Sequence, residues 1–217
     1  MEYNIVKLFL KTDDKLTSNA SKIRGFIGNE FKEYNLLHNH YGKNYLYTYP
    51  KVQYKIVDNQ ILIFGLNEGG EVLKKISSDL NFLDLDKKYN INEKVIHEQK
   101  FDIKPTIDEK HYKFVTPWIG LNTNNYQKFK KMNEWKDKKI LLNNIIVGNI
   151  LSLSKGLGII VNKKLYVKSF LNEENIIYKS VRMNAFTGEF KIHYDLPDYI
   201  GIGKGVSQGF GCVKKIN

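Results

Sequence analysis

Along the first half of the chain, apolar and polar positions follow strand and helix periods in turn. Residues 3–11 alternate partly and are rich in β-branched and aromatic side chains, which predicts a strand. Residues 20–31 place apolar side chains on one helical face behind a cap at Thr17 or Ser18. Strands over 52–57 and 61–66, a helix over 69–83 and a strand over 95–103 follow. This β-α-β-β-α-β order predicts a ferredoxin-like domain.

The second half has a less regular pattern. A strand is predicted over 114–121, helices over 126–132 and 137–154, and strands over 165–170, 175–186, 189–194 and 210–216, with a turn at Thr187 and Gly188. These elements fit a second, decorated copy of the same fold, although no sequence repeat links the two halves. We therefore predict an α+β chain with two ferredoxin-like (RRM-like) domains in tandem, residues 1–107 and 108–217.

Composition narrows the class of protein. The chain is 42% hydrophobic and 26% charged, which is typical of a soluble globular protein. Cys212 is the single cysteine, so an internal disulfide is excluded and a reducing compartment is favoured. The most apolar window, 140–161, is interrupted by Asn, Ser and Lys, and it predicts a buried or half-buried helix, not a bilayer span. Without a signal-peptide pattern at its start, the chain is expected to be cytoplasmic, with no membrane partner.

Positive charge is concentrated in the second half. Of a net charge of +11, residues 1–110 carry 17 Lys and Arg against 16 Asp and Glu, and residues 111–217 carry 17 against 7. A basic half predicts a polyanion partner whose binding weakens as salt rises. A solvated, lysine-rich surface is the alternative, and charge alone does not separate RNA from DNA or lipid. The lysines around Trp135, within 128–139, either belong to a surface that binds RNA or form the outer face of a helix.

The most informative stretch is GIGKGVSQGFG, residues 201–211, called the glycine segment below. Glycine permits positive φ and lets a ligand approach the main chain without meeting a Cβ. Exposed N–H groups together with Lys204 would then face an anion, most simply a phosphate. Alternatively, the glycines serve only as tight turns. Because the segment leads into a final strand, it is not a nucleotide-binding loop that opens a helix.

A second group of polar side chains lies in residues 37–43, which contain two imidazoles, a phenol and an ammonium. Imidazole suits proton transfer because its pKa lies near ambient pH. If this segment is extended, His38 and His40 point to the same side and could act as base and acid, or as catalyst and orienting partner. A surface pair, or half of a metal site, is the alternative. Zinc usually needs three or four ligands, and the other histidines are scattered.

Carboxylates are informative because they are dispersed. The acidic pairs at 13–14, 84 and 86, and 173–174 are short and lie in polar segments. Two-metal nuclease chemistry needs several carboxylates that converge on ions about 4 Å apart. The sequence therefore predicts neither a metal site nor a cofactor.

Several of these segments resemble the CRISPR-associated repeat-processing endoribonucleases of the RAMP superfamily. The glycine segment is similar to that family's glycine-rich loop. The stretches IRGFIGN (23–29), HNHYG (38–42), YPKVQYK (49–55) and GLNEG (65–69) are similar to one archaeal and bacterial branch. The resemblance covers most of the first 75 residues and the last 17, whereas 105–195 carries no matching motif.

The resemblance implies metal-independent cleavage of CRISPR precursor RNA within its repeats, leaving a 2′,3′-cyclic phosphate and a 5′-hydroxyl. It implies that His40 is the principal proton-transfer residue, that Tyr47 is a hydrogen-bonding partner and that His38 assists. CRISPR repeat RNA is the implied partner, and a homodimer or an effector complex stays open. The residues expected to bind RNA are Arg24, Lys43, Lys51, Gly203, Lys204, Gly205, Ser207, Gln208 and Gly209.

Two other functions stay open at this point. A non-catalytic RAMP subunit that binds crRNA in an effector complex would keep the glycine segment and the basic half, but would have no use for His40. A metal-dependent nuclease would use His38 and His40 as ligands.

Overall fold

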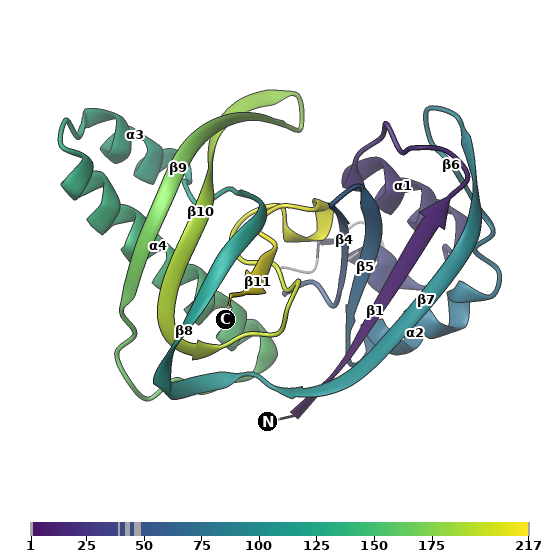
Figure 1. Cartoon of the computed structure of the whole chain (residues 1–217), viewed down its shortest axis with the longest axis horizontal. Helices are drawn as coiled ribbons and strands as arrows, with labels where there is room; N and C mark the ends of the chain where they lie inside the picture. Colours follow the sequence, from purple (N-terminus) through teal and green to yellow (C-terminus); the bar gives the residue numbers. More distant parts are fainter. Residues whose placement is uncertain (1, 39, 42–43, 46–48, 217) are drawn as a thin grey trace. The chain divides into compact units, whose positions relative to one another are not determined.

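The computed structural model describes residues 2–38, 40–41, 44–45 and 49–216 (Figure 1). The chain forms two compact units, each described by itself. The N-terminal unit contains Glu2–Asp102 together with Val206–Gly209, and the C-terminal unit contains Ile103–Gly205 and residues 210–216. The sequence places the domain change at residue 107, whereas the two units divide between Asp102 and Ile103.

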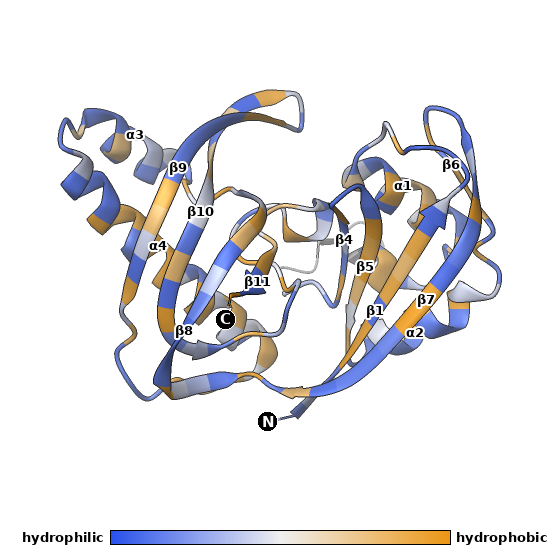
Figure 2. Cartoon of the chain, in the orientation of Figure 1, coloured by the Kyte–Doolittle hydropathy of each residue, from blue (hydrophilic) through white to orange (hydrophobic). Residues whose placement is uncertain are grey.

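The N-terminal unit is built on a five-stranded sheet in the order β4-β5-β1-β7-β6, with neighbours antiparallel. Helices α1 and α2 pack on it, and their apolar side chains share one core with β1, β4 and β5. Figure 2 shows the hydrophobic residues gathered on β1 and β5, the central strands. The elements are β1 (Glu2–Thr12), α1 (Ala20–Glu30), η1 (Asn35–Leu37), β2 (His40–Tyr41), β3 (Asn44–Tyr45), β4 (Val52–Val57), β5 (Gln60–Leu66), α2 (Glu68–Ser77), β6 (Phe82–Asp84) and β7 (Lys88–Asp102).

This unit confirms the ferredoxin-like prediction and corrects several boundaries. Between the predicted strands 52–57 and 61–66, Asp58 and Asn59 have φ of 52° and 60°, the left-handed pair of a two-residue hairpin turn. The cap of α1 is Asn19, whose side chain accepts a hydrogen bond from the Lys22 N–H, and not Thr17 or Ser18. Helix α2 ends at Ser77, because the apolar residues that follow form the short strand β6.

The C-terminal unit contains a four-stranded antiparallel sheet in the order β11-β8-β10-β9, which is again the ferredoxin-like order. Two helices lie between β8 and β9, where the ferredoxin-like order has one. The second domain therefore carries an additional helix, as expected for a decorated copy of the fold. Where a second helix would join the last two strands, the chain instead runs through the glycine segment and the short turn η2 (Val206–Gln208). The other elements are β8 (Lys104–Trp118), α3 (Thr123–Lys131), α4 (Trp135–Leu157), β9 (Val167–Tyr178), β10 (Val181–Asp195) and β11 (Val213–Lys215).

The predicted turn at Thr187 and Gly188 is wrong. The hairpin turns at Lys179 and Ser180, which adopt φ of 49° and 63° without a glycine. Gly188 lies inside β10 at a register shift, with φ of 113°. A Cβ there would lie 2.2 Å from the carbonyl oxygen of Phe170, so this glycine permits close strand packing and does not reverse the chain.

Helix α4 contains residues 140–157 of the apolar window at 140–161. By length and composition alone it could cross a bilayer. However, the polar residues that interrupt it bond to the sheet: Asn149 Oδ1 accepts from Trp118 Nε1 at 3.0 Å, and Ser154 Oγ lies 2.8 Å from Tyr194 Oη. Leu142, Ile146, Ile150 and Leu153 of this helix are buried. The prediction of a helix packed in the protein is therefore confirmed.

Two glycines with opposite surroundings test this packing. Gly211→Ala should destabilise the protein by more than about 1 kcal/mol, because φ is +64° and the new Cβ would lie 2.0 Å from Ile202 O. Gly148→Ala, at a position in α4 with no atom within 4 Å, should stabilise it by about 0.5–1 kcal/mol. Urea unfolding of both variants measures the difference, and equal midpoints would contradict the described packing.

Candidate active site

Helix α1 positions His38 by direct packing. A Cβ on Gly28 would lie 2.1 Å from Cε1 of His38, so the imidazole rests on the helix backbone itself. His38 is half-buried and follows η1 as its C-terminal cap. Because any side chain at position 28 would occupy the space of the ring, Gly28 helps to set where the imidazole lies. The sequence shows Gly28 only as part of a resembled motif, since its contact with His38 is tertiary.

Two donors hold the backbone that carries His38. The Arg24 guanidinium of α1 donates to the carbonyl of His38, and the Tyr54 hydroxyl of β4 donates to the carbonyl of Leu37 at 3.3 Å. Burial raises the pKa of Tyr54 far above its ordinary value, and nearby Arg24 lowers it only in part. The phenol therefore stays protonated and remains a donor. Arg24, predicted to bind RNA, thus has a structural contact inside the N-terminal unit.

The principal predicted catalytic residues are only partly described. The backbone of His40 lies in β2 and pairs with Tyr45 of β3. The side chain of His40, and all of Lys43 and Tyr47, lie outside the described residues, so their roles remain predictions. The start of the segment that contains both histidines is positioned by hydrogen bonds from α1 and β4 to the carbonyls of His38 and Leu37.

Two lysines on or beside β4 differ in their surroundings. Lys51, a predicted RNA ligand, pairs with Glu68 at 2.7 Å, and this hydrogen bond lowers the pKa of Glu68. Lys55 is fully buried and donates to Gln53 Oε1 at 2.7 Å, while Gln53 Nε2 donates to Tyr49 Oη at 3.0 Å. These buried hydrogen bonds were not predicted, although strand alternation places residues 53 and 55 on one face.

In the C-terminal unit, the glycine segment is fastened to the end of β8. Ile119 O accepts from Lys204 N at 3.0 Å, and Pro117 O accepts from Gly211 N at 2.8 Å. Gly203 has φ of 90°, and a Cβ there would lie 2.6 Å from Trp118 Nε1. The predicted positive φ values are therefore confirmed, and protein atoms occupy the space that the missing side chains leave.

The middle of the glycine segment belongs to the N-terminal unit. Gly209, with φ of 97°, lies against α1 and β4, where a Cβ would be 2.8 Å from Ala20 Cβ and 3.3 Å from Tyr54 O. Ser207 and Gln208, in η2, are half-buried. Helix α1 thus contacts the glycine segment through Ala20 and contacts His38 through Gly28. These two helix positions are eight residues, or about 12 Å, apart along the helix axis.

Lys204 presents the clearest cation of the segment. Its side chain is exposed, and its Nζ lies 5.5 Å from the centre of the Tyr178 ring. The Tyr178 ring also packs edge-on against Phe210, with 5.4 Å between the ring centres. Because Phe210 belongs to the glycine segment, the segment itself helps to position the ring beneath Lys204. Within the described residues, no group of three or more His, Cys, Asp and Glu side chains could hold a metal ion.

Two glycines of α1 test how His38 is positioned. Gly28→Ala should displace the imidazole and change its resonances, because the added methyl would overlap the ring. Gly25→Ala, with no atom within 4 Å of its Cβ, should leave those resonances unchanged. Side-chain NMR of the histidines measures both variants, and an unmoved His38 in Gly28→Ala would contradict the packing.

Comparison with known proteins matches both units to one family. The model of the Cas6b N-terminal domain matches residues 1–102, and that of the Cas6b C-terminal domain matches residues 104–216. The uncharacterised protein MJ0978 of Methanocaldococcus jannaschii is 44% identical over 106 residues, which cover 48% of this chain and 71% of that protein.

Solved structures agree over the whole length. A crystal structure of Cas6b is 33% identical, with a TM-score of 0.91, and a crystal structure of the CRISPR RNA processing endoribonuclease Cas6b is 32% identical, with a TM-score of 0.79. Each comparison covers 100% of both chains. With both domain models matched and full-length relatives above 30% identity, the chain belongs to the Cas6b family of crRNA-processing endoribonucleases.

Proposed function

We propose that this chain cleaves CRISPR precursor RNA within its repeats to produce crRNA, without a metal ion. The ribose 2′-hydroxyl attacks the adjacent phosphorus, and the bond from phosphorus to O5′ breaks as the bond to O2′ forms. The products are a 2′,3′-cyclic phosphate and a 5′-hydroxyl. Membership of the Cas6b family supports the choice of substrate, because a solved relative is a CRISPR RNA processing endoribonuclease.

The observation that carries this proposal is the double role of helix α1. The first residue of the helix, Ala20, packs against Gly209 of the glycine segment, and Arg24 and Gly28, farther along the helix, contact His38. A segment suited to an RNA backbone and a segment suited to proton transfer therefore depend on one rigid element. Rigid positioning of the reacting groups is a large part of what a catalyst of this reaction must supply.

The reaction needs a base for the 2′-hydroxyl proton, an acid for O5′ and a stabiliser for the added negative charge. His40 is the principal proton-transfer residue in this proposal, with His38 as its partner and Tyr47 as a hydrogen-bond donor to the phosphate. Lys204 and Lys43 supply positive charge. Lys51 is a weaker candidate, because Glu68 already holds its ammonium at 2.7 Å.

The nature of the reaction is tested with two substrates. In excess EDTA, the protein should cleave CRISPR repeat RNA and leave a cyclic phosphate end. It should not cleave the same RNA with a 2′-deoxy residue at the cut site, because the nucleophile is then missing. Cleavage rescued only by added metal would favour the metal-dependent nuclease. Binding without any product would favour the non-catalytic RAMP subunit.

His40→Ala should lower the single-turnover cleavage rate by about 10²- to 10⁴-fold while leaving RNA affinity near that of the unchanged protein. His193→Ala is the matched control: this imidazole contacts Ile107 O at 2.7 Å in the C-terminal unit and should leave the rate unchanged. Equal rates for the two variants would remove His40 from the mechanism.

Lys204→Ala should weaken RNA binding and lower the slope of log affinity against log salt by about one, because one phosphate contact is lost. Lys155→Ala removes the same charge at an exposed position in the last turn of α4 and should change both quantities less. Filter binding at several salt concentrations measures the slopes. A slope unchanged by Lys204→Ala would place this lysine away from the RNA.

A further inference from the structure

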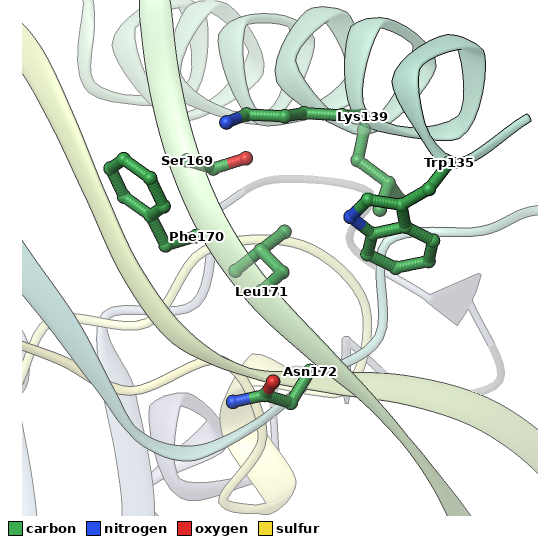
Figure 3. Close-up of a pocket in the computed structure, with 7 residues that line it drawn as sticks. Trp135, Lys139, Ser169, Phe170, Leu171 and Asn172 are labelled. Atoms are coloured by element: carbon green, nitrogen blue, oxygen red, sulfur yellow. The ribbon is translucent and has the colours of Figure 1, made fainter.

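A pocket lies between the first turns of α4 and the strand β9, within the C-terminal unit. Its volume is about 240 Å³, and it is lined by Trp135, Lys139 and Leu142 of α4 and by residues 169–172 of β9. Figure 3 shows Trp135 and Lys139 extending from the helix toward this strand, with the Lys139 ammonium reaching toward Phe170. The volume is below the roughly 300–1,000 Å³ of sites for drug-sized ligands, so the pocket suits a single planar group.

Two aromatic faces of this pocket are open to solvent. Trp135 is 44% exposed and Phe170 is 66% exposed, although both are large apolar side chains. Trp135 is braced edge-on by buried Phe129 at 6.5 Å, and the Lys139 ammonium lies 4.4 Å from the centre of the Phe170 ring. One exposed ring is therefore braced by a neighbouring ring and the other lies beside a cation, and proteins use exposed aromatic rings and nearby cations to bind single-stranded nucleic acid.

The strand side of the pocket also offers hydrogen bonds. Among the strands that the structure describes, β9 pairs with β10 alone and forms the edge of its sheet. An edge strand directs a row of N–H and C=O groups outward, and these can meet the polar edge of a base. Asn172 adds an amide to the lining.

Charge favours an anionic ligand here. Residues 128–139 contain six lysines against two acidic residues, Glu134 and Asp137. Of the six, Lys138 lies 4.9 Å from the ring centre of Phe129, and Lys139 lines the pocket itself. A polyanion drawn to this surface would bring its bases to the two exposed rings.

We infer that this pocket binds one nucleobase and its phosphate from a single-stranded part of the RNA substrate. Trp135 and Phe170 would provide the stacking faces, and Lys139 would leave the Phe170 ring to contact the phosphate. The identity of the RNA as CRISPR repeat RNA rests on the proposed function. The pocket lies in the half that carries most of the net charge, and it extends the RNA-binding surface beyond the glycine segment.

Intrinsic fluorescence tests the stacking directly, because the chain has two tryptophans and Trp118 is fully buried. Titration with uncleavable repeat RNA, 2′-deoxy at the cut site, should quench the exposed Trp135. In Trp135→Phe, most of the quenching should disappear while affinity stays within about twofold, because phenylalanine still offers a stacking face. Quenching that persists in Trp135→Phe would overturn the proposal.

Binding assays with the same RNA supply the second measurement. Trp135→Ala and Phe170→Ala should each weaken binding by about 5- to 150-fold. Lys139→Ala should lower the salt slope by about one, whereas Lys155→Ala, about 24 Å away on the same helix, should not. Wild-type affinity in both aromatic variants would overturn the proposal.

Further measurements distinguish failure of the pocket proposal from failure of the proposed function, and distinguish RNA from other occupants of the pocket. If the unchanged protein binds RNA but forms no product, the proposed reaction fails while the pocket is still judged by quenching and affinity. Uridine monophosphate should quench Trp135 far more weakly than RNA. If the mononucleotide saturates the pocket while Trp135→Ala and Phe170→Ala leave RNA affinity unchanged, the pocket would be a site for a free nucleotide. If the protein forms dimers without RNA and Phe170→Ala disrupts them, β9 would instead contact a second copy of the chain. Either result would overturn the proposal.

Discussion

The close contact between Gly28 and the His38 imidazole is the constraint on which the candidate active site of the N-terminal unit depends. Glycine within a helix destabilises it by about 1 kcal/mol relative to alanine, so its presence in α1 needs a compensating contact. At position 28 that contact is the imidazole ring of His38, which packs on the helix backbone, and the Arg24 guanidinium also donates to the carbonyl of His38. Nothing in the described structure explains the second glycine of α1, Gly25, which has no atom within 4 Å of its Cβ direction.

The glycine segment shows how one pattern can serve two physical purposes. From sequence, its glycines indicate a main chain open to a ligand, yet at 203, 209 and 211 the missing Cβ leaves room for Trp118, Ala20 and Ile202 respectively. The N–H groups of Lys204 and Gly211 already donate to carbonyls. If the segment binds phosphate as proposed, the side chains of Lys204 and Ser207 must therefore contribute more than an interpretation based on backbone N–H groups assigns to them. The glycines allow the backbone conformation of the segment, and the Lys204 side chain provides its positive charge.

Much of the fold could be predicted because strand and helix periods were clear in the first half of the chain, and both ferredoxin-like orders are confirmed. The errors occurred where tertiary contacts overrode local preference: Lys179 and Ser180 adopt positive φ without glycine, while Gly188 stays in a strand. At the candidate site, His38 was visible from its chemistry. Tyr54 was not, because its hydrogen bond to the Leu37 carbonyl joins residues that only the fold brings together.

Lysines make two kinds of contact in this chain. Some pair with carboxylates, as in Lys51–Glu68 and Lys87–Asp14 of the N-terminal unit and Lys215–Asp195 of the C-terminal unit. Others lie over aromatic rings, as in Lys88–Phe82 of the N-terminal unit and Lys138–Phe129, Lys139–Phe170, Lys164–Tyr166 and Lys204–Tyr178 of the C-terminal unit. An exposed cation–π contact contributes about 0.5–1 kcal/mol, whereas a stacked base contributes about 1–3 kcal/mol. A base can therefore displace the ammonium from its ring, and the released charge is then available to the phosphate of the same nucleotide.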